Sequence, residues 1–496
     1  MKKFLMVLCC VLSFGFVLAG CSTVSMIKNE NNEVIYNGSA SVSVGDYLYY
    51  GNAFNEVSSL TSKSELNALK SSSYLARLDT SNISAKGQNF TPNEVKKVTS
   101  EVVGQENQFI FVLGDYLYFL KPDTHVYVTD GTGSNQFGYS VLTSVKLNGD
   151  KVREICTYEG AISQIEVLKN GDNYYVVAFA GDKLFSTKLN NGKGSTKVLG
   201  EGVTSVAVPE TYSMALAGYS SDWNGKIYYT ATDDEGVSSV KEVAVDAKSA
   251  EDAVNVGDKN GTVTFLHRQN DLIFYTYSNG TTPKTYYNRV DNLTGEFYTN
   301  DIILIDAKNK FSNSEISNIY VFGEPKSETI VYTMNSKIYY KNFVNGGGSG
   351  MVNITDGSAD VSATIMTIDG RMAYLISSTA IYGVDFAKLT YLDGDQDLNA
   401  NILAEMTSIS TTLYSYDGEY VYFYAGLEAL TDEEKELIAD EKEEAGIESD
   451  DEEEEEDITS LDDGVYLYRV SISGNDLQLL GVTEYEERHS NYVYKK

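Results

Sequence analysis

The chain repeats a short tyrosine-rich pattern along most of its length, and this repeat restricts the folds that it can adopt. Each copy begins with a small or polar residue and continues as a run of aliphatic and aromatic residues. The eight copies are GDYLYY (Gly45–Tyr50), GDYLYF (Gly114–Phe119), GDNYYVV (Gly171–Val177), GKIYYT (Gly225–Thr230), NDLIFY (Asn270–Tyr275), ETIVYT (Glu328–Thr333), GRMAYL (Gly370–Leu375) and GEYVYFY (Gly418–Tyr424). A self-similar chain of this kind folds as an array of equivalent units.

The third copy shows what one unit contains. It predicts strands at Tyr174–Ala180, Lys183–Leu189 and Thr196–Leu199, separated by Gly/Asn/Asp turns. We expect the segment Val203–Val208 to be the remaining strand of that unit. The chain has 38 Tyr and 41 Gly but only 5 Pro, which favours short strands joined by glycine turns. Aromatics and glycines therefore predict an all-β fold.

The repeat length and the apolar character of the strands predict a β-propeller. Copies begin about 40–70 residues apart, and the shorter spacings match a four-stranded blade. The repeated strands are apolar on both faces, as expected when each sheet packs between two neighbours. Arranging the sheets around an axis buries both faces and protects the edges. We expect eight blades, with seven as the alternative, in a domain spanning residues 34–496.

Three insertions account for the uneven spacing. Asn55–Ser73 contains Ser-Lys-Ser-Glu, a capping box that predicts a short helix. Pro122–Tyr139 is rich in Gly, Asp, Asn and Thr and predicts a long loop. The third, residues 427–463, is strongly acidic. It lies between the predicted strands Tyr420–Tyr424 and Gly464–Val470, so we expect it to extend a hairpin of the last blade.

The acidic insertion carries much of the charge of the chain. The whole sequence has a net charge of −33, of which −18 lies between Glu428 and Asp463. Its first part predicts a helix after Thr431, whereas Asp450–Asp457 is an unbroken acidic run that repels itself and predicts disorder. This charge disfavours nucleic acid as a partner. The insertion is either a solvated extension or an arm that recruits a basic protein or cations.

The first 20 residues have the pattern of an export signal. Two lysines precede an apolar run, Phe4–Leu18, and small residues lead to Cys21. The run has 15 residues, fewer than the roughly 20 needed to cross a bilayer core. The ending Leu-Ala-Gly-Cys resembles the bacterial lipobox, which implies a signal peptide at residues 1–20 and a lipid on Cys21. An ordinary signal peptide and an N-terminal membrane span are the alternatives.

The lipobox resemblance implies a location at the extracytoplasmic face of the cell membrane. Residues 21–33 would then be the lipidated cysteine and a polar tether, Ser22–Glu33. Twelve extended residues reach about 40 Å. The membrane would be one partner, through the lipid, and a protein or glycan at the cell surface the other.

The repeat also resembles the propeller modules of bacterial surface lipoproteins of the DUF5050 type. Tyr466–Arg469 followed by Ile472–Asn475 is the copy that matches their pattern best. The resemblance implies the fold and the surface setting, and it supplies no catalytic residues. The propeller lipoproteins of outer-membrane protein assembly are similar only at the level of the fold. A binding or scaffolding module is the function that we expect, with a propeller-type glycan hydrolase as the alternative.

The sequence offers few residues for catalysis or metal binding. His125, His267 and His489 have no metal-binding spacing, and Cys156 is the one cysteine outside the leader and Cys21. We expect Cys156 to be a buried residue of a strand. The run Gly346–Gly350 lacks the lysine of a phosphate-binding loop and predicts a turn. We therefore expect no cofactor and no catalytic residue.

The run Asp393–Asn399 has alternate acidic positions, as calcium loops do. Leu398 stands where such a loop has Gly, and Glu405 comes one position too late for the final ligand. We expect a simple turn, with a calcium site as the alternative. A solute-binding protein is disfavoured because the chain lacks alternating strand and helix patterns.

Overall fold

The computed structural model describes the greater part of the repeat region. The described residues are 34–38, 41–51, 64, 74–81, 95–103, 109–123, 128–129, 135–136, 139–210, 223–233, 235–256, 262–269, 271–278, 284–289, 302–305, 316–323, 327–342, 348–357, 360–406, 408–426, 465–474 and 477–480. The leader, Cys21 and the tether lie outside these ranges, as do residues 427–464 of the acidic insertion.

The described strands form consecutive antiparallel units of four strands, numbered here as units 1 to 8. Unit 1 comprises β2 (Ser41–Val44), β3 (Tyr47–Gly51), β4 (Tyr74–Asp79) and β5 (Val95–Val102). Unit 2 comprises β6 (Ile110–Leu113), β7 (Tyr116–Pro122), β10 (Ser140–Lys146) and β11 (Arg153–Tyr158). Unit 3 comprises β12 (Ile162–Asn170), β13 (Asn173–Ala180), β14 (Lys183–Asn190) and β15 (Lys193–Gly200). Unit 4 comprises β16 (Val203–Ala207), β17 (Lys226–Thr232), β18 (Ser238–Ala244) and β19 (Val254–Asn255).

The second half of the chain continues in the same way. Unit 5 comprises β20 (Thr262–Gln269), β21 (Leu272–Ser278), β22 (Lys284–Arg289) and β23 (Ile302–Ile305). Unit 6 comprises β24 (Ile316–Phe322), β25 (Thr329–Met334), β26 (Lys337–Asn342) and β27 (Ser349–Thr355). Unit 7 comprises β28 (Thr364–Asp369), β29 (Met372–Ile376), β30 (Ala380–Asp385) and β31 (Gln396–Glu405). Unit 8 comprises β32 (Ile409–Tyr416), β33 (Tyr420–Gly426), β34 (Val465–Ser471) and β35 (Gln478–Leu479).

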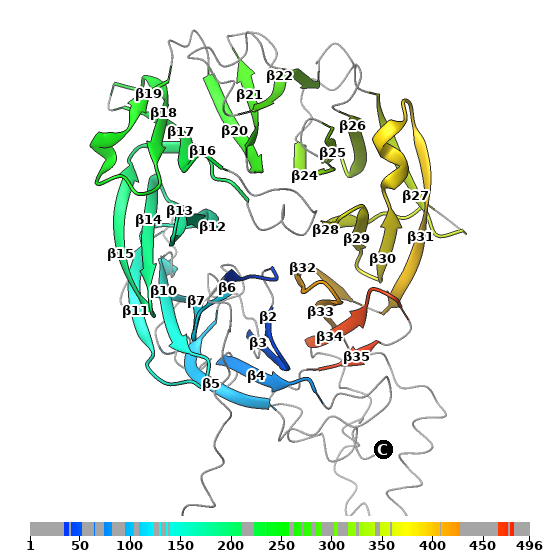
Figure 1. The fold of residues 1–496 in the computed structure, drawn as a ribbon, viewed down its shortest axis with the longest axis horizontal. Helices are drawn as coiled ribbons and strands as arrows, with labels where there is room; N and C mark the ends of the chain where they lie inside the picture. Colours follow the sequence, from blue (N-terminus) through cyan, green and yellow to red (C-terminus); the bar gives the residue numbers. More distant parts are fainter. Residues whose placement is uncertain are drawn as a thin grey trace, which may run out of the picture.

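The units follow one another around a ring (Figure 1). The first strand of each unit lies nearest the centre of the ring and the fourth lies at the rim. The described part has two short 3-10 helices, η3 (Ala250–Asp252) and η5 (Ala387–Tyr391). No helix among the described residues combines the length and the apolar character that a membrane span needs. The chain is an all-β propeller, as the repeat predicted.

The tyrosine-rich copy forms the second strand of each unit, not the first. In unit 3 the hairpin register pairs Asn170 with Asn173, so Gly171 and Asp172 form a two-residue turn between β12 and β13. Gly171 has a φ of 58°, a conformation that glycine adopts without steric cost. The segment at 203–208 was therefore assigned to the wrong unit. It contains β16, the first strand of unit 4, whereas β12 completes unit 3.

The insertions lie between second and third strands. β33 and β34 pair antiparallel with Gly426 opposite Val465, so the chain leaves and re-enters unit 8 at the same place. The predicted helix within residues 55–73 lies outside the described residues except for Ser64. The predicted long loop of unit 2 contains a two-stranded ribbon, β8 (Val128–Thr129) with β9 (Asn135–Gln136). Strands of two residues are too short to be recognised from a sequence pattern.

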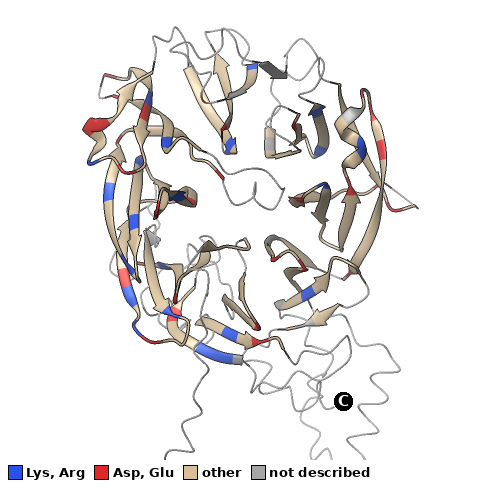
Figure 2. Ribbon diagram, viewed as in Figure 1, with Lys and Arg blue, Asp and Glu red and all other residues tan. Residues whose placement is uncertain are grey.

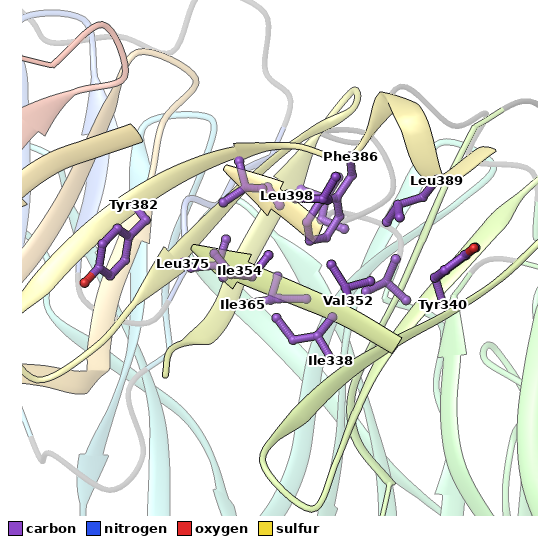
Figure 3. Close-up of a cluster of buried hydrophobic side chains, with 14 of the residues drawn as sticks. Ile338, Tyr340, Val352, Ile354, Ile365, Leu375, Tyr382, Phe386, Leu389 and Leu398 are labelled. Carbon is purple, nitrogen blue, oxygen red and sulfur yellow. The ribbon is translucent and has the colours of Figure 1, made fainter. Parts of the chain in front are cut away.

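The hydrophobic core lies between neighbouring units. Between units 6 and 7, Val352 and Ile354 of β27 pack with Ile365, Leu375 and Leu398 of unit 7 (Figure 3). These residues are at most 4% exposed. Burying each such side chain contributes about 1.5–3 kcal/mol relative to leaving it in water. The ring thus buries sheets that no single unit could bury alone.

Among the described residues, units 1 and 8 meet without sharing a strand. Leu48 and Tyr50 of unit 1 pack against Tyr422, Tyr424 and Leu467 of unit 8. The Tyr424 hydroxyl donates a hydrogen bond to the Gly51 carbonyl at 2.8 Å. Side-chain packing therefore carries much of this closure.

The N-terminal segment adds backbone contacts at the same closure. β1 (Val34–Ile35) pairs with β6 of unit 2, and Gly38 forms an isolated bridge with Ser415 of β32. The Tyr416 amide donates to the Asn37 carbonyl at 2.7 Å. Residues 34–38 thus connect the first strands of units 2 and 8 across unit 1.

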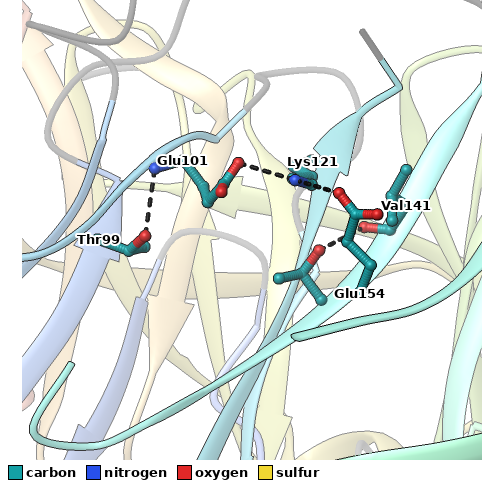
Figure 4. Close-up of polar contacts among 6 residues, drawn as sticks. Thr99, Glu101, Lys121, Val141 and Glu154 are labelled. Atoms are coloured by element: carbon teal, nitrogen blue, oxygen red, sulfur yellow. Dashed lines mark hydrogen bonds and ion pairs between the residues drawn. The ribbon is translucent and has the colours of Figure 1, made fainter. Parts of the chain in front are cut away.

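Charged residues of both signs are interspersed on the outer strands and also occur on strands nearer the centre (Figure 2). One group links units 1 and 2: the Lys121 ammonium lies 2.8 Å from Glu101 of β5 and 2.7 Å from Glu154 of β11 (Figure 4). Burial acts to lower the pKa of Lys121, but the two carboxylates outweigh it and raise the pKa. The lysine therefore stays charged between the two outer strands.

Candidate functional site

A cluster of polar side chains forms where the first strands of several units approach the centre of the ring. Glu210 lies three residues after β16, and its backbone amide donates to the Arg268 carbonyl of β20 at 2.8 Å. Its carboxylate Oε1 lies 3.1 Å from Nδ1 of His267. The His267 side chain is 10% exposed and that of Glu210 is 29% exposed, so the pair is shielded but reachable from solvent.

A second carboxylate, Glu166, lies close to Glu210. The Gln164 side chain on β12 donates a long hydrogen bond, 3.5 Å, to the Val208 carbonyl. Glu166 lies two residues after Gln164 on β12, and Glu210 lies two residues after Val208 in the segment that follows β16. Burial, and then the negative charge of Glu210, raise the pKa of Glu166 well above its usual range. The two carboxylates therefore compete for ionisation.

Two tyrosines complete the cluster from the other side of the ring. The Tyr320 hydroxyl of β24 donates to the backbone carbonyls of Ile365 and Met366 at 2.9 and 3.2 Å. Burial raises the pKa of both Tyr320 and Tyr414 of β32, and the charge of Glu210 adds to the rise in each. Glu210 thus acts electrostatically on residues of units 3, 6 and 8, besides its contact with unit 5.

The imidazole of His267 has one nitrogen without a partner. Nδ1 faces Glu210, whereas Nε2 is buried and forms no hydrogen bond within the described structure. Buried polar atoms are normally hydrogen-bonded, and an orphaned one costs free energy. This atom is therefore an open position for a ligand or a water molecule.

The cluster combines two carboxylates, an imidazole and two phenols from five units. Carboxylates in different environments can accept hydrogen bonds, bind a positive charge, or act as an acid and base pair. Among the described residues, no group of three or more His, Cys, Asp or Glu side chains has a geometry that would hold a metal ion.

Known proteins show similarity to the chain at the level of the fold. No protein-family model and no curated protein matches it. The solved structures that resemble it include a puromycin-hydrolysing peptidase from Mycobacterium tuberculosis, aligned at 8% identity over 74% of this chain and 52% of the peptidase chain, with a TM-score of 0.39. This chain thus spans about half the length of that peptidase chain.

Two further structures are β-propeller proteins of archaeal and bacterial origin. The propeller domain of the Trilobed protease from Pyrococcus furiosus aligns at 9% identity over 78% of this chain and 96% of that domain, with a TM-score of 0.34. TolB from Acinetobacter baumannii aligns at 12% identity over 54% of this chain and 61% of TolB, with a TM-score of 0.27. At such values the sheet topology carries the fold assignment, and the similarities carry no argument about function.

The cysteines and histidines considered in the sequence lie in different parts of the chain. Cys21, His125 and His489 lie outside the described residues. Cys156 lies on β11 as predicted, but it is half-buried, with its sulfur 3.5 Å from the Thr187 hydroxyl. His267 was given no role from sequence, yet it belongs to the central cluster.

The calcium-like run is used for pairing between units. β31 runs parallel to β27, and the acidic side chains accept hydrogen bonds from it: Asp393 from the Ser349 amide, Asp395 from the Met351 amide, and Asp397 from the Asn353 side chain, at 2.8–3.1 Å. The expected simple turn is therefore wrong for most of this run. The alternate acidic residues that resemble a calcium loop instead provide carboxylate acceptors along the edge of β27.

No sequence motif marks the residues of the central cluster. Glu166 and Glu210 are two of 71 acidic residues, and neither belongs to a motif. Both residues lie on or just after the first strand of a unit. The sequence-based prediction took the tyrosine-rich strand as the first strand, so it did not identify these positions. Once the hairpin turns are placed before the tyrosine-rich strands, the first strands can be found and searched.

Proposed function

We propose that the protein is a lipid-anchored, extracytoplasmic β-propeller with eight blades that serves as a binding or scaffolding module at the cell envelope. The lipobox ending at Cys21 supports the anchor, and the repeat resembling DUF5050 modules supports the surface setting. The eight four-stranded units of the described chain support the blade number. The observation that carries the proposal is the position at which the N-terminal segment enters the ring.

The ring has two distinct faces. The turns between first and second strands, such as Gly114–Asp115, lie on one face, which we name the first-turn face. Val34 pairs with Leu113, the residue just before that turn, so the chain enters the ring at the first-turn face. β33 begins at this face, after the turn at 417–419, and ends at Gly426 on the opposite face.

The chain therefore enters the ring at Val34 and departs from it at Gly426 on opposite faces. Because the tether directly precedes Val34 in the sequence, we infer that the first-turn face is directed toward the lipid anchor. At the opposite face lie the ends of the second strands β3, β7 and β33, after which the three inserted sequences follow in the chain. An anchored propeller with this topology presents its three insertions away from the membrane, where a partner can reach them.

The anchor is tested with Cys21→Ala. We expect this variant to remain unprocessed and to lose lipid labelling, because the thiol is the site of attachment. A control variant, Cys156→Ala, should be processed and labelled like the natural chain. Equal processing and membrane retention of Cys21→Ala would overturn the anchor.

The orientation is tested by energy transfer to an acceptor lipid. A donor on Asp172→Cys, at a first turn, should transfer more efficiently than a donor on Ser449→Cys, in the acidic insertion, both in a Cys156→Ser background. The reverse order would place the insertions toward the membrane and contradict the proposed arrangement.

A second candidate is a propeller hydrolase that acts on envelope or extracellular glycans. The specific observation in its favour is the Glu166–Glu210 pair, since glycosidases use two carboxylates with different pKa values. Turnover of a glycan by the purified chain, abolished by Glu166→Gln and unaffected by Glu405→Gln on the rim strand β31, would favour this candidate. The absence of turnover across a glycan panel would favour binding.

A further inference from the structure

We propose that residues 34–38 form a strap that locks the ring at its closure and that detaches while the units stay folded. Units 1 and 8 share no strand among the described residues, so the strap supplies backbone contacts across this closure. Its release frees the central edges of β6 and β32 and lets units 1 and 8 separate. This conformational device goes beyond the proposed binding role and does not depend on the lipid anchor.

The last two residues of the strap attach it to unit 8. The Tyr416 amide of β32 donates to the Asn37 carbonyl at 2.7 Å, and Gly38 forms an isolated bridge with Ser415. The Ser415 hydroxyl in turn shares a hydrogen bond with the hydroxyl of Ser41 on β2. Both serines are at most 1% exposed. The strap thus meets unit 8 at the residue through which β32 contacts unit 1.

Units 1 and 2 hold the other side of the strap. Asn37 is 8% exposed, and its side-chain oxygen accepts a hydrogen bond from the Ser43 amide of β2 at 2.9 Å. The strand β1 pairs with β6, and the ring of Tyr36 lies 5.5 Å from that of Phe109, just before β6. The strap makes all these contacts together only when units 8, 1 and 2 are adjacent. Its attachment therefore shifts the equilibrium toward the closed ring.

The strap is held less firmly than the strands that it joins. β1 has two residues, whereas β2 has four and β32 has eight. Val34, Ile35 and Tyr36 are each only half-buried. Segments with few buried apolar contacts open locally at a lower free energy than core strands. We therefore expect the strap to detach before any unit unfolds.

Gly38 makes attachment of the strap sensitive to a single substitution. Its φ is 121°, a conformation that residues with a side chain rarely adopt. A Cβ placed on it would lie 3.1 Å from the Ser415 Cα and 3.1 Å from the Tyr414 carbonyl oxygen. Both atoms belong to the backbone of β32, so they cannot move aside as the end of a flexible side chain would. Gly38→Ala should therefore detach the strap from unit 8.

The test is native-state hydrogen exchange of the full chain, purified in detergent and followed at single amides. The Tyr416 amide reports attachment directly, since its partner is a strap carbonyl. We expect this amide to exchange at a lower free energy of opening than the amides of β33, because the strap opens first. Gly38→Ala should speed its exchange roughly ten-fold or more. Exchange in β2 should also become faster, while β17 and β18 of unit 4 keep their natural rates.

Gly370→Ala is the matched control. Gly370 also has a positive φ, 58°, but a Cβ placed on it meets no atom within 4 Å. It lies in the first turn of unit 7, away from the strap, so the Tyr416 amide should exchange as in the natural chain. Equal acceleration of the Tyr416 amide by both variants would mean that lower overall stability, and not release of the strap, is responsible, and would overturn the proposal.

Two other results would also overturn it. If the Tyr416 amide and the β33 amides of the natural chain open at the same free energy, the strap does not detach separately from unit 8. If Gly38→Ala leaves β2 unchanged, or speeds β17 and β18 as much as β2, the strap does not lock the closure. Failure of the Cys21→Ala or energy-transfer tests would affect the anchor alone, so the two proposals fail separately.

Discussion

At the scale of single residues, the central carboxylate Glu166 lowers the stability of the folded protein at neutral pH. A shielded Glu166 beside a second carboxylate is less easily ionised in the folded protein than in the unfolded chain. Its pKa is raised, so the favourable contribution of its protonated form is complete below the ordinary pKa of 4.5 and is lost as the pH rises toward the pKa of the folded protein. At neutral pH the unfolded chain, in which Glu166 ionises freely, is therefore favoured relative to the folded protein. Residues retained at such a cost are commonly functional.

Glu166→Gln should consequently stabilise the protein at neutral pH. We expect a higher midpoint of denaturation than the natural chain at pH 7, and a difference that shrinks toward pH 4. Urea titrations at several pH values provide the measurement. Glu405→Gln is the matched control and should show neither effect. A lower midpoint for Glu166→Gln at pH 7 would mean that the carboxylate has a stabilising partner.

At the scale of the structural elements, two-residue glycine turns decide where each unit begins. Gly171 has a φ of 58° and open space around a Cβ placed on it. The cost of a side chain there is therefore conformational and not steric. Left-handed conformations cost most residues about 1–2 kcal/mol, but Asn adopts them more readily.

Gly171→Val should destabilise unit 3 by about 1–2 kcal/mol, and Gly171→Asn by clearly less. The comparison of the two variants by chemical denaturation isolates the backbone effect, since both add a side chain to the same open position. Equal losses would show that contacts of the side chain, and not the value of φ, set the cost.

The acidic insertion is a second feature at this scale, because the strands that flank it pair without it. Replacing residues 427–463 by a short Gly/Ser turn should keep β33 and β34 together, since Gly426 already lies opposite Val465. Shortening the loop lowers its closure entropy by roughly 0.6 kcal/mol per halving of length. The melting temperature should therefore stay level or rise. A clear fall would show that the insertion packs on the propeller.

At the scale of the whole molecule, the ring is held differently at different interfaces. Units 6 and 7 share one sheet, in which β27 and β31 pair through backbone hydrogen bonds over Val352–Thr355. Units 1 and 8 are joined by packed side chains, the Tyr424–Gly51 hydrogen bond and the contacts of residues 34–38. The closure between the first and last units is therefore the place where the ring should open first.

Hydrogen exchange of the native protein tests this order. We expect amides of β2 and β32 to exchange at a lower free energy of opening than those of β27 and β31. Leu467→Ala, at the closure, should cost about 2–5 kcal/mol and speed exchange in units 1 and 8 first. The matched variant Leu375→Ala, between units 6 and 7, should act there instead. Uniform acceleration throughout the ring in both variants would mean that the propeller opens as one cooperative unit.

The sequence by itself determined that the chain forms repeated β units, because strand formation depends on local pattern, tyrosine content and glycine turns. It did not determine which strand begins a unit, since a repeated up-and-down chain can be divided at any of its turns. The hydrogen bonds of the folded sheets determine which strand begins each unit. The acidic run at 393–399 likewise acquired its role only when β31 came to lie beside β27. Glu166, Glu210, His267, Tyr320 and Tyr414 are distant in sequence, and ring closure alone brings them to one place.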